Sequence, residues 1–125
     1  MQVTIEPRAG YLKVIVRRRE SVEDNRSITS TIIEAAKAHE RDRLLLVGEQ
    51  SDPIYRVHQY DLEGWFRQLR ELGVRRVALV SDSAELFASH QYIELLAAQR
   101  GAPLRAFRDE KRALGWLLGE EGRGG

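Results

Sequence analysis

The stretch LLLV, residues 44–47, decides the fold of this chain. It is short, wholly apolar and flanked by polar residues, which is typical of a strand inside a sheet that is covered on both faces. The stretch VALV, residues 77–80, has the same character. Because segments with helical periodicity alternate with these strands, we predict parallel strands joined by right-handed crossovers, as in an α/β domain.

Two alternating segments precede LLLV. QVTIE, residues 2–6, and YLKVIV, residues 11–16, place apolar side chains on every second position, as half-buried strands do. The stretch PRAG, residues 7–10, lies between them and consists of turn formers. We therefore predict a hairpin that adds one antiparallel strand near an edge of the sheet.

Four segments have the apolar spacing of helices, and each begins at a residue that can cap a helix. With their caps they cover residues 21–39, 61–73, 81–101 and 109–119, and LRAF at 104–107 is a last short strand. The predicted order is β-β-α-β-α-β-α-β-α, an α/β fold with a mixed five-stranded sheet and four helices. It forms one domain over residues 1–118, and residues 119–125 are expected to be a disordered tail because they have nothing to bury.

The composition excludes several classes of protein. The chain has 125 residues, a formal charge of +1 and no cysteine, so we expect no thiolate metal site, no thiol nucleophile and no nucleic-acid interface. No apolar run is long enough for a membrane span. The first ten residues, MQVTIEPRAG, lack the layout of a secretory signal, and we expect a cytoplasmic protein.

Several stretches resemble one family. They are GYLKVIV at 10–16, RLLLV at 43–47, RRVALVSD at 75–82 and above all RAFRDEKRALGWL at 105–117. With the element order, they make residues 1–118 similar to the SpoIIAA-like (STAS-like) family. That family includes anti-sigma-factor antagonists and small stand-alone proteins. The resemblance implies a regulatory or binding fold that takes protein partners or small ligands and does not run a reaction.

The chain departs from this family at the phosphorylation site. Regulatory antagonists carry a phosphorylatable serine in a D-S-S-G-like motif at the start of the helix after the third strand. Here the corresponding stretch is YDLEGW, residues 60–65, with Asp61 at the cap and no serine or threonine between Ser51 and Ser81. Asp61 already carries a charge and cannot be switched by a kinase. Constitutive partner binding remains open.

The connection over residues 48–60 is long. It has thirteen residues, against about two to six in a usual strand-to-helix connection. In one interpretation Ile54 and Val57 pack against the core beneath the connection, and the connection is only structural. We favour a loop that also presents polar and aromatic side chains to a ligand or partner. The candidate binding residues are Tyr55, Arg56, His58, Tyr60 and Asp61.

Two other kinds of site are weaker. Five acids gather at the carboxyl ends of the strands, where α/β sheets bind ligands, but helix starts account for all except Glu49 and Asp52. The others are Asp61, Asp82 and Glu85. The histidines lack zinc-site spacing and are expected to be solvated or at helix ends, and the basic runs RRR at 17–19 and RR at 75–76 are expected to be solvated turns. The histidines are His39, His58 and His90.

We therefore predict a non-catalytic binding or regulatory module that acts at the carboxyl edge of the sheet, with no cofactor and no metal. The partner is a protein or a small ligand, and a homodimer remains open. The alternative is a small enzyme or ligand carrier that uses the strand-end acids and His58. A buried pocket faced by two uncapped carboxylates would favour the alternative, whereas a convex face with exposed aromatic residues would favour a protein partner.

Overall fold

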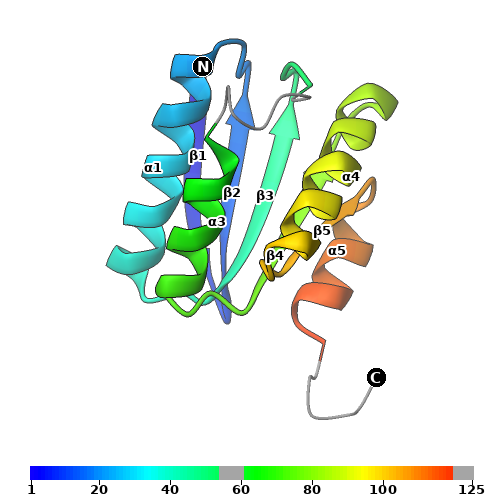
Figure 1. Ribbon diagram of the computed structural model, residues 1–125. Helices are drawn as coiled ribbons and strands as arrows, with labels where there is room; N and C mark the ends of the chain where they lie inside the picture. Colours follow the sequence, from blue (N-terminus) through cyan, green and yellow to red (C-terminus); the bar gives the residue numbers. More distant parts are fainter. Residues whose placement is uncertain (54–60, 120–125) are drawn as a thin grey trace.

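The computed structural model describes residues 1–53 and 61–119 of the chain. These residues form an α/β fold with a five-stranded mixed sheet in the order β1-β2-β3-β4-β5, and the described part contains four helices (Figure 1). The strands are β1 (Gln2–Arg8), β2 (Tyr11–Arg17), β3 (Arg43–Glu49), β4 (Arg76–Ser81) and β5 (Leu104–Phe107). The helices are α1 (Val22–His39), α3 (Leu62–Glu71), α4 (Ala84–Gln99) and α5 (Glu110–Leu117).

The predicted element order is confirmed over these residues, and the first hairpin differs in detail. β1 pairs antiparallel with β2 at the edge of the sheet, in a register that sets Arg8 opposite Tyr11. The turn therefore contains only Ala9 and Gly10, and the four-residue turn predicted for PRAG is wrong. Pro7 lies within β1, which is tolerated because an edge strand need not donate every N–H group. Gly10 has a φ of 84°, a conformation that suits glycine.

The prediction for LLLV is confirmed. β3 is the middle strand and pairs in parallel with β2 and β4. Leu44 and Leu46 belong to the core on one face of the sheet, and Leu45 and Val47 to the core on the other. All four side chains are buried, so both faces of this strand are covered.

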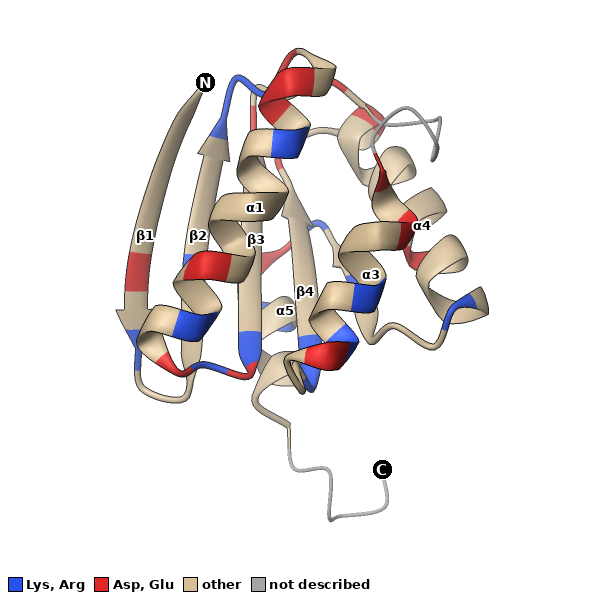
Figure 2. Ribbon diagram, turned by 60° about the vertical axis from the view of Figure 1, so that its left-hand side comes forward, with Lys and Arg blue, Asp and Glu red and all other residues tan. Residues whose placement is uncertain are grey.

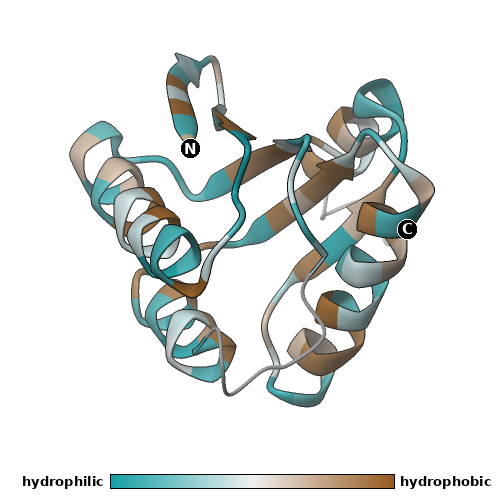
Figure 3. Cartoon of the chain, turned by 90° about the horizontal axis from the view of Figure 1, so that it is seen from above, coloured by the Kyte–Doolittle hydropathy of each residue, from teal (hydrophilic) through white to brown (hydrophobic). Residues whose placement is uncertain are grey.

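The two faces of the sheet carry unequal layers. The larger core contains buried residues of α1, α3 and α4, and the smaller core contains Ala113 and Leu117 of α5. Seen from above, the strands run through the middle of the domain with helices on both sides (Figure 3). Three helices therefore cover one face, and the short α5 covers the middle of the other.

Two arginines attach α5 to the sheet. A guanidinium nitrogen of Arg43 donates to the carbonyl oxygen of Leu117 at 2.8 Å, and Arg76 donates to that of Trp116. The Arg76 guanidinium also lies 5.1 Å from the centre of the Trp116 ring. Basic residues gather at these amino ends of β3 and β4 (Figure 2). The expectation that the run at 75–76 is a solvated turn is therefore wrong for Arg76, which stabilises the carbonyl end of a helix.

Three helix starts have the predicted caps. The hydroxyl of Ser21 accepts from the backbone N–H of Asp24 at 3.0 Å, and that of Ser83 accepts from Leu86 at 3.1 Å. The carboxylate of Asp109 accepts from Lys111. These side chains satisfy N–H groups that a helix leaves unpaired in its first turn.

Asp61 does not cap α3 as predicted. It occupies the N-cap position, but its side chain makes no capping hydrogen bond. Its backbone is left-handed, with φ 52° and ψ 43°, and not extended as at the N-caps Ser21, Ser83 and Asp109. The two carboxylate oxygens each lie 3.1 Å from the place that a Cβ at Gly64 would take, so the glycine gives them room.

No described helix is long and apolar enough to cross a membrane.

The burial of Trp65 gives a first prediction. Its side chain is 5% exposed and packs in the larger core, so Trp65→Ala should lower the free energy of unfolding by about 3 to 5 kcal/mol. The control is Arg67→Ala, an exposed position of the same helix, which should change stability by less than about 0.5 kcal/mol. Urea denaturation measures both. A loss under about 1 kcal/mol for Trp65→Ala would contradict the packing of α3.

The backbone at Asp61 gives a second prediction. Asp61→Ala should lower the free energy of unfolding by about 1 kcal/mol because a left-handed conformation is unfavourable for alanine. Asp61→Gly should be at least as stable as the wild type, since glycine adopts this conformation without strain. Asp61→Ser separates backbone strain from capping. If backbone strain decides, the serine variant should be as unstable as the alanine variant in thermal denaturation. A serine variant with nearly the stability of the wild type would show that its side chain forms a capping hydrogen bond.

Candidate functional site

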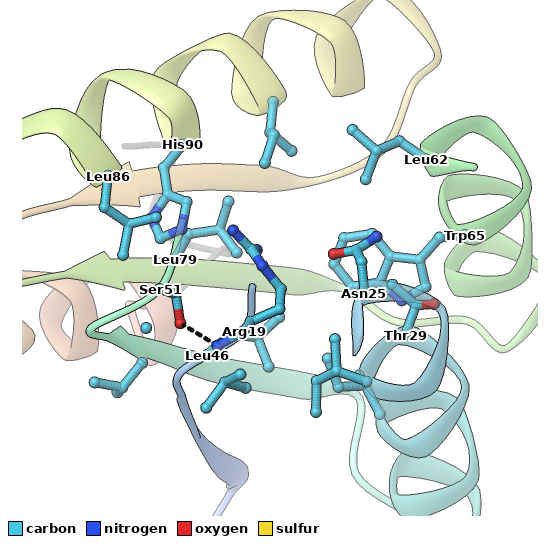
Figure 4. A pocket seen from close by; sticks show the side chains of 16 residues that line it. Arg19, Asn25, Thr29, Leu46, Ser51, Leu62, Trp65, Leu79, Leu86 and His90 are labelled. Atoms are coloured by element: carbon cyan, nitrogen blue, oxygen red, sulfur yellow. Dashed lines mark hydrogen bonds between the residues drawn. The ribbon is translucent and has the colours of Figure 1, made fainter. Parts of the chain in front are cut away.

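A cavity of about 70 Å³ lies at the carboxyl ends of β2, β3 and β4, beneath α1, α3 and α4. This is the edge at which ligands bind in open α/β sheets. Figure 4 shows the cavity from close by. Aliphatic side chains form much of its wall: Val16, Ile28, Leu46, Leu79, Leu86 and Ile93.

Polar side chains enter the same cavity from the segment after β2 and from α1, α3 and α4. In Figure 4 the side chain of Arg19 extends between His90 on one side and Asn25 and Trp65 on the other. Ser51, in the segment after β3, also lines the cavity. Residues far apart in the chain therefore bring several polar groups into one mostly apolar space.

Arg19 is held by the segment that follows β3. Its backbone N–H donates to the hydroxyl of Ser51 at 3.2 Å, and its carbonyl oxygen accepts from the N–H of Asp52 at 2.9 Å. The guanidinium donates to the carbonyl oxygen of Asp52. Arg19 is only 9% exposed, so the expectation of a solvated run at 17–19 is wrong for this residue, although Arg17 and Arg18 are exposed.

His90 is buried and uncharged. It projects from the middle of α4, is 6% exposed, and its Nδ1 has no hydrogen-bond partner among residues 1–53 and 61–119. Burial and, secondly, the positive charge of Arg19 lower the pKa of His90 from 6.5 to about 3. The expectation of a solvated or helix-end histidine is wrong for His90. It is confirmed for His39, which is exposed in the last turn of α1, and His58 lies outside the described residues.

Trp65 supplies a second unpaired group. Its indole Nε1 is buried and also lacks a hydrogen-bond partner in the part of the chain that the structure describes. A buried donor without a partner costs about 1 to 3 kcal/mol relative to a satisfied one. Two such atoms at one cavity are unusual, because nearly all buried polar groups in folded proteins are paired.

The acids predicted to gather at this edge do not enter the cavity. Glu49 forms an ion pair with Arg17, and the carboxylate of Asp82 accepts from the backbone N–H of Gln50 at 3.1 Å. Asp82 was expected to serve a helix start, but Ser83 caps α4 and Asp82 instead ties the ends of β3 and β4 together. Among the described residues that line the cavity there is no carboxylate.

Most of the predicted binding residues cannot be placed. Tyr55, Arg56, His58 and Tyr60 lie outside the described residues. Asp61 is exposed and lines a different, polar groove of about 230 Å³ between α1 and α3. The connection predicted to begin at Gly48 begins two residues later, because β3 continues to Glu49. Gly48 at the end of β3 and Ser51 in the described start of the connection both line the cavity.

Two residues of the cavity, Asn25 and His90, could have been predicted from the sequence but were not. Asn25 stands three residues before Ile28 on the apolar stripe of α1 and is buried. His90 stands between Leu86 and Ile93 on the buried stripe of α4. A polar residue at a core-facing helix position needs a buried partner, so each of these positions marked a polar site inside the domain.

The described residues contain no group of three or more histidines and acids that could hold a metal ion.

No protein-family model, no curated protein and no solved structure matches this chain.

The neutral state of His90 predicts a specific loss of stability in acid. In the unfolded chain the imidazole takes up a proton below its ordinary pKa of 6.5, whereas in the folded chain it stays neutral down to about pH 3. Proton uptake by the unfolded state favours unfolding. The contribution of the neutral His90 to the free energy of unfolding is therefore fully present above pH 6.5 and is lost as the pH falls toward 3. Between about pH 7 and pH 4 the loss is roughly 3 kcal/mol.

Urea denaturation at these two pH values tests this. His90→Phe should reduce the difference in unfolding free energy by that amount, because the variant has no imidazole to titrate at this position. The control His39→Gln, at an exposed site, should retain the wild-type difference. An unchanged difference in His90→Phe would show that His90 is not the buried neutral group.

Proposed function

We propose that this chain is a non-catalytic binding module that takes a small ligand in the cavity at the carboxyl edge of its sheet. One observation carries the proposal. The buried Nε1 of Trp65 and Nδ1 of His90 both belong to residues that line the cavity, and neither has a hydrogen-bond partner among the described residues. A ligand with hydrogen-bonding groups would satisfy them, and this would offset their cost.

The described surface favours a small ligand over a protein partner. Its exposed large hydrophobic residues are Met1, Leu95 and Leu118, and none is aromatic. Protein interfaces are usually centred on buried aromatic or arginine anchors, and of these two kinds the described surface offers exposed arginines, such as Arg18 and Arg67, without an exposed aromatic residue. The tyrosines of the 48–60 connection could still supply such anchors, and their role stays a prediction because they lie outside the described residues.

The SpoIIAA-like (STAS-like) resemblance is part of this proposal. The described order of strands and helices agrees with the order on which the resemblance was based. Asp61 stands at the start of α3, where the regulated antagonists carry serine. We therefore propose constitutive binding without a phosphorylation switch, in a cytoplasmic protein.

The alternative is a small enzyme that uses the strand-end acids and His58. An acid that serves as general acid or base must lie within hydrogen-bond reach of the bound substrate, and His58 lies outside the described residues. Glu49 is ion-paired with Arg17, and Asp52 is exposed. These positions favour binding over catalysis.

A cavity-filling substitution tests the proposed function. Val16 lines the cavity, and its neighbour Ile15 in β2 packs on the opposite face of the sheet. A screen of small fragments, followed by the indole N–H signals in ¹⁵N NMR spectra, should find compounds that move the Trp65 signal. Val16→Phe should abolish these shifts, and Ile15→Phe should retain them. Overpacking could lower the stability of either variant by about 1 to 3 kcal/mol, so both are first checked for folding.

The proposal fails if no fragment moves the Trp65 signal, or if Val16→Phe binds the fragments as the wild type does.

A further inference from the structure

The size of the cavity limits its ligand. A cavity of about 70 Å³ is roughly half the volume of one of about 150 Å³ that holds benzene. The enclosed part of the ligand therefore has roughly three to five non-hydrogen atoms. This is the size of a short aliphatic chain with one polar group.

The wall fixes which end of the ligand is apolar. Leu46 and Leu79 line the cavity from neighbouring strands, and Leu86 and Ile93 line it from α4. Methylene and methyl groups that pack against these side chains are removed from water, which is favourable because no polar group is desolvated. The ligand body is therefore aliphatic.

The polar groups of the wall fix the other end. The indole Nε1–H of Trp65 and the guanidinium of Arg19 can only donate hydrogen bonds, and no carboxylate lines the described cavity. The other polar side chains of the wall, which include Ser51 and His90, can donate as well as accept. An acceptor at the polar end of the ligand can therefore be bonded by all of these groups, whereas a donor would be matched by neither Trp65 nor Arg19. A cationic end would find no anionic group to hold it.

Charge selects among acceptors. Arg19 keeps its bond to the Asp52 carbonyl, yet its positive charge still acts within the cavity, since it helps to keep His90 neutral. An anion at this place is attracted to Arg19 and makes charge-assisted hydrogen bonds, which are about twice as strong as neutral ones.

We propose that the cavity binds the carboxylate of a short-chain aliphatic acid, with the carboxylate toward Trp65 and Arg19 and the alkyl chain against Leu46 and Leu79. This inference rests on the proposed function and adds the chemical class of the ligand. The apolar wall, the donor-only groups and the charge of Arg19 together carry it.

Three probes of similar size test it on the wild-type chain: sodium propionate, propionamide and propylammonium chloride, at matched ionic strength and in a buffer free of carboxylates. The chain has two tryptophans, and Trp116 packs with the core on the other face of the sheet. Its indole N–H signal is therefore an internal control, assigned with Trp116→Phe. Propionate should move the Trp65 signal in a saturable way at millimolar concentrations and leave the Trp116 signal in place. Propionamide should bind about tenfold more weakly, and propylammonium should not bind.

Two variants in one basic run give a matched pair. Arg19→Gln removes the charge at the cavity and should lower the affinity for propionate to that for propionamide. Arg17→Gln removes an exposed charge two residues away and should leave the affinity for propionate unchanged. If Arg19→Gln does not fold, the comparison of the three probes on the wild type still decides.

Equal binding of propionamide and propionate, or an Arg19→Gln variant that folds and binds propionate as the wild type does, would overturn the carboxylate assignment. A Trp65 signal that none of the three probes moves would overturn it as well. The proposed function is judged separately, by the fragment screen and the Val16→Phe variant.

Discussion

The burial of β3 on both faces is the constraint on which the rest of the structure depends. A central strand of four apolar residues needs cover above and below the sheet. Because each parallel strand lies beside the one before it, crossovers of one hand place α1, α3 and α4 on the same face. The other face is left to α5, whose last carbonyl groups are held by Arg43 and Arg76. α5 is thus the helix that completes the cover of β3.

The same arrangement accounts for the cavity. The three helices on one face meet the sheet at its carboxyl edge, where the connecting segments leave the strands. Gly48 allows Leu86 and His90 to approach β3, since a Cβ at this position would lie 3.0 Å from a methyl group of Leu86. Arg19 is then drawn inward by Ser51 and Asp52, which belong to the segment after the next strand. The polar wall therefore depends on contacts between two strand ends and not on one local motif.

Local patterns predicted the fold better than the site. Strand and helix identity follows from the spacing of apolar residues, so the element order was predicted from the sequence and is found in the described residues. Aspartate is a residue type that often caps helices, but the left-handed backbone of Asp61 could not be predicted from its residue type. Arg19 could not be predicted either, because its burial depends on residues 51 and 52, more than thirty positions along the chain. His90 could have been identified, since it interrupts a buried helical stripe.

The polar residues of the cavity also bear on stability. Apolar side chains at positions 65 and 90 would fill the same space without an unpaired nitrogen, and in protein cores such replacements are often neutral or stabilising. The nitrogens of Trp65 and His90 that lack a partner among the described residues, beside the buried charge of Arg19, therefore lower the stability of the domain. Among the described residues, the smaller core on the other face contains no buried side-chain nitrogen or oxygen without a hydrogen-bond partner. The unpaired polar atoms of the described residues are therefore confined to the cavity, which supports the proposed binding role.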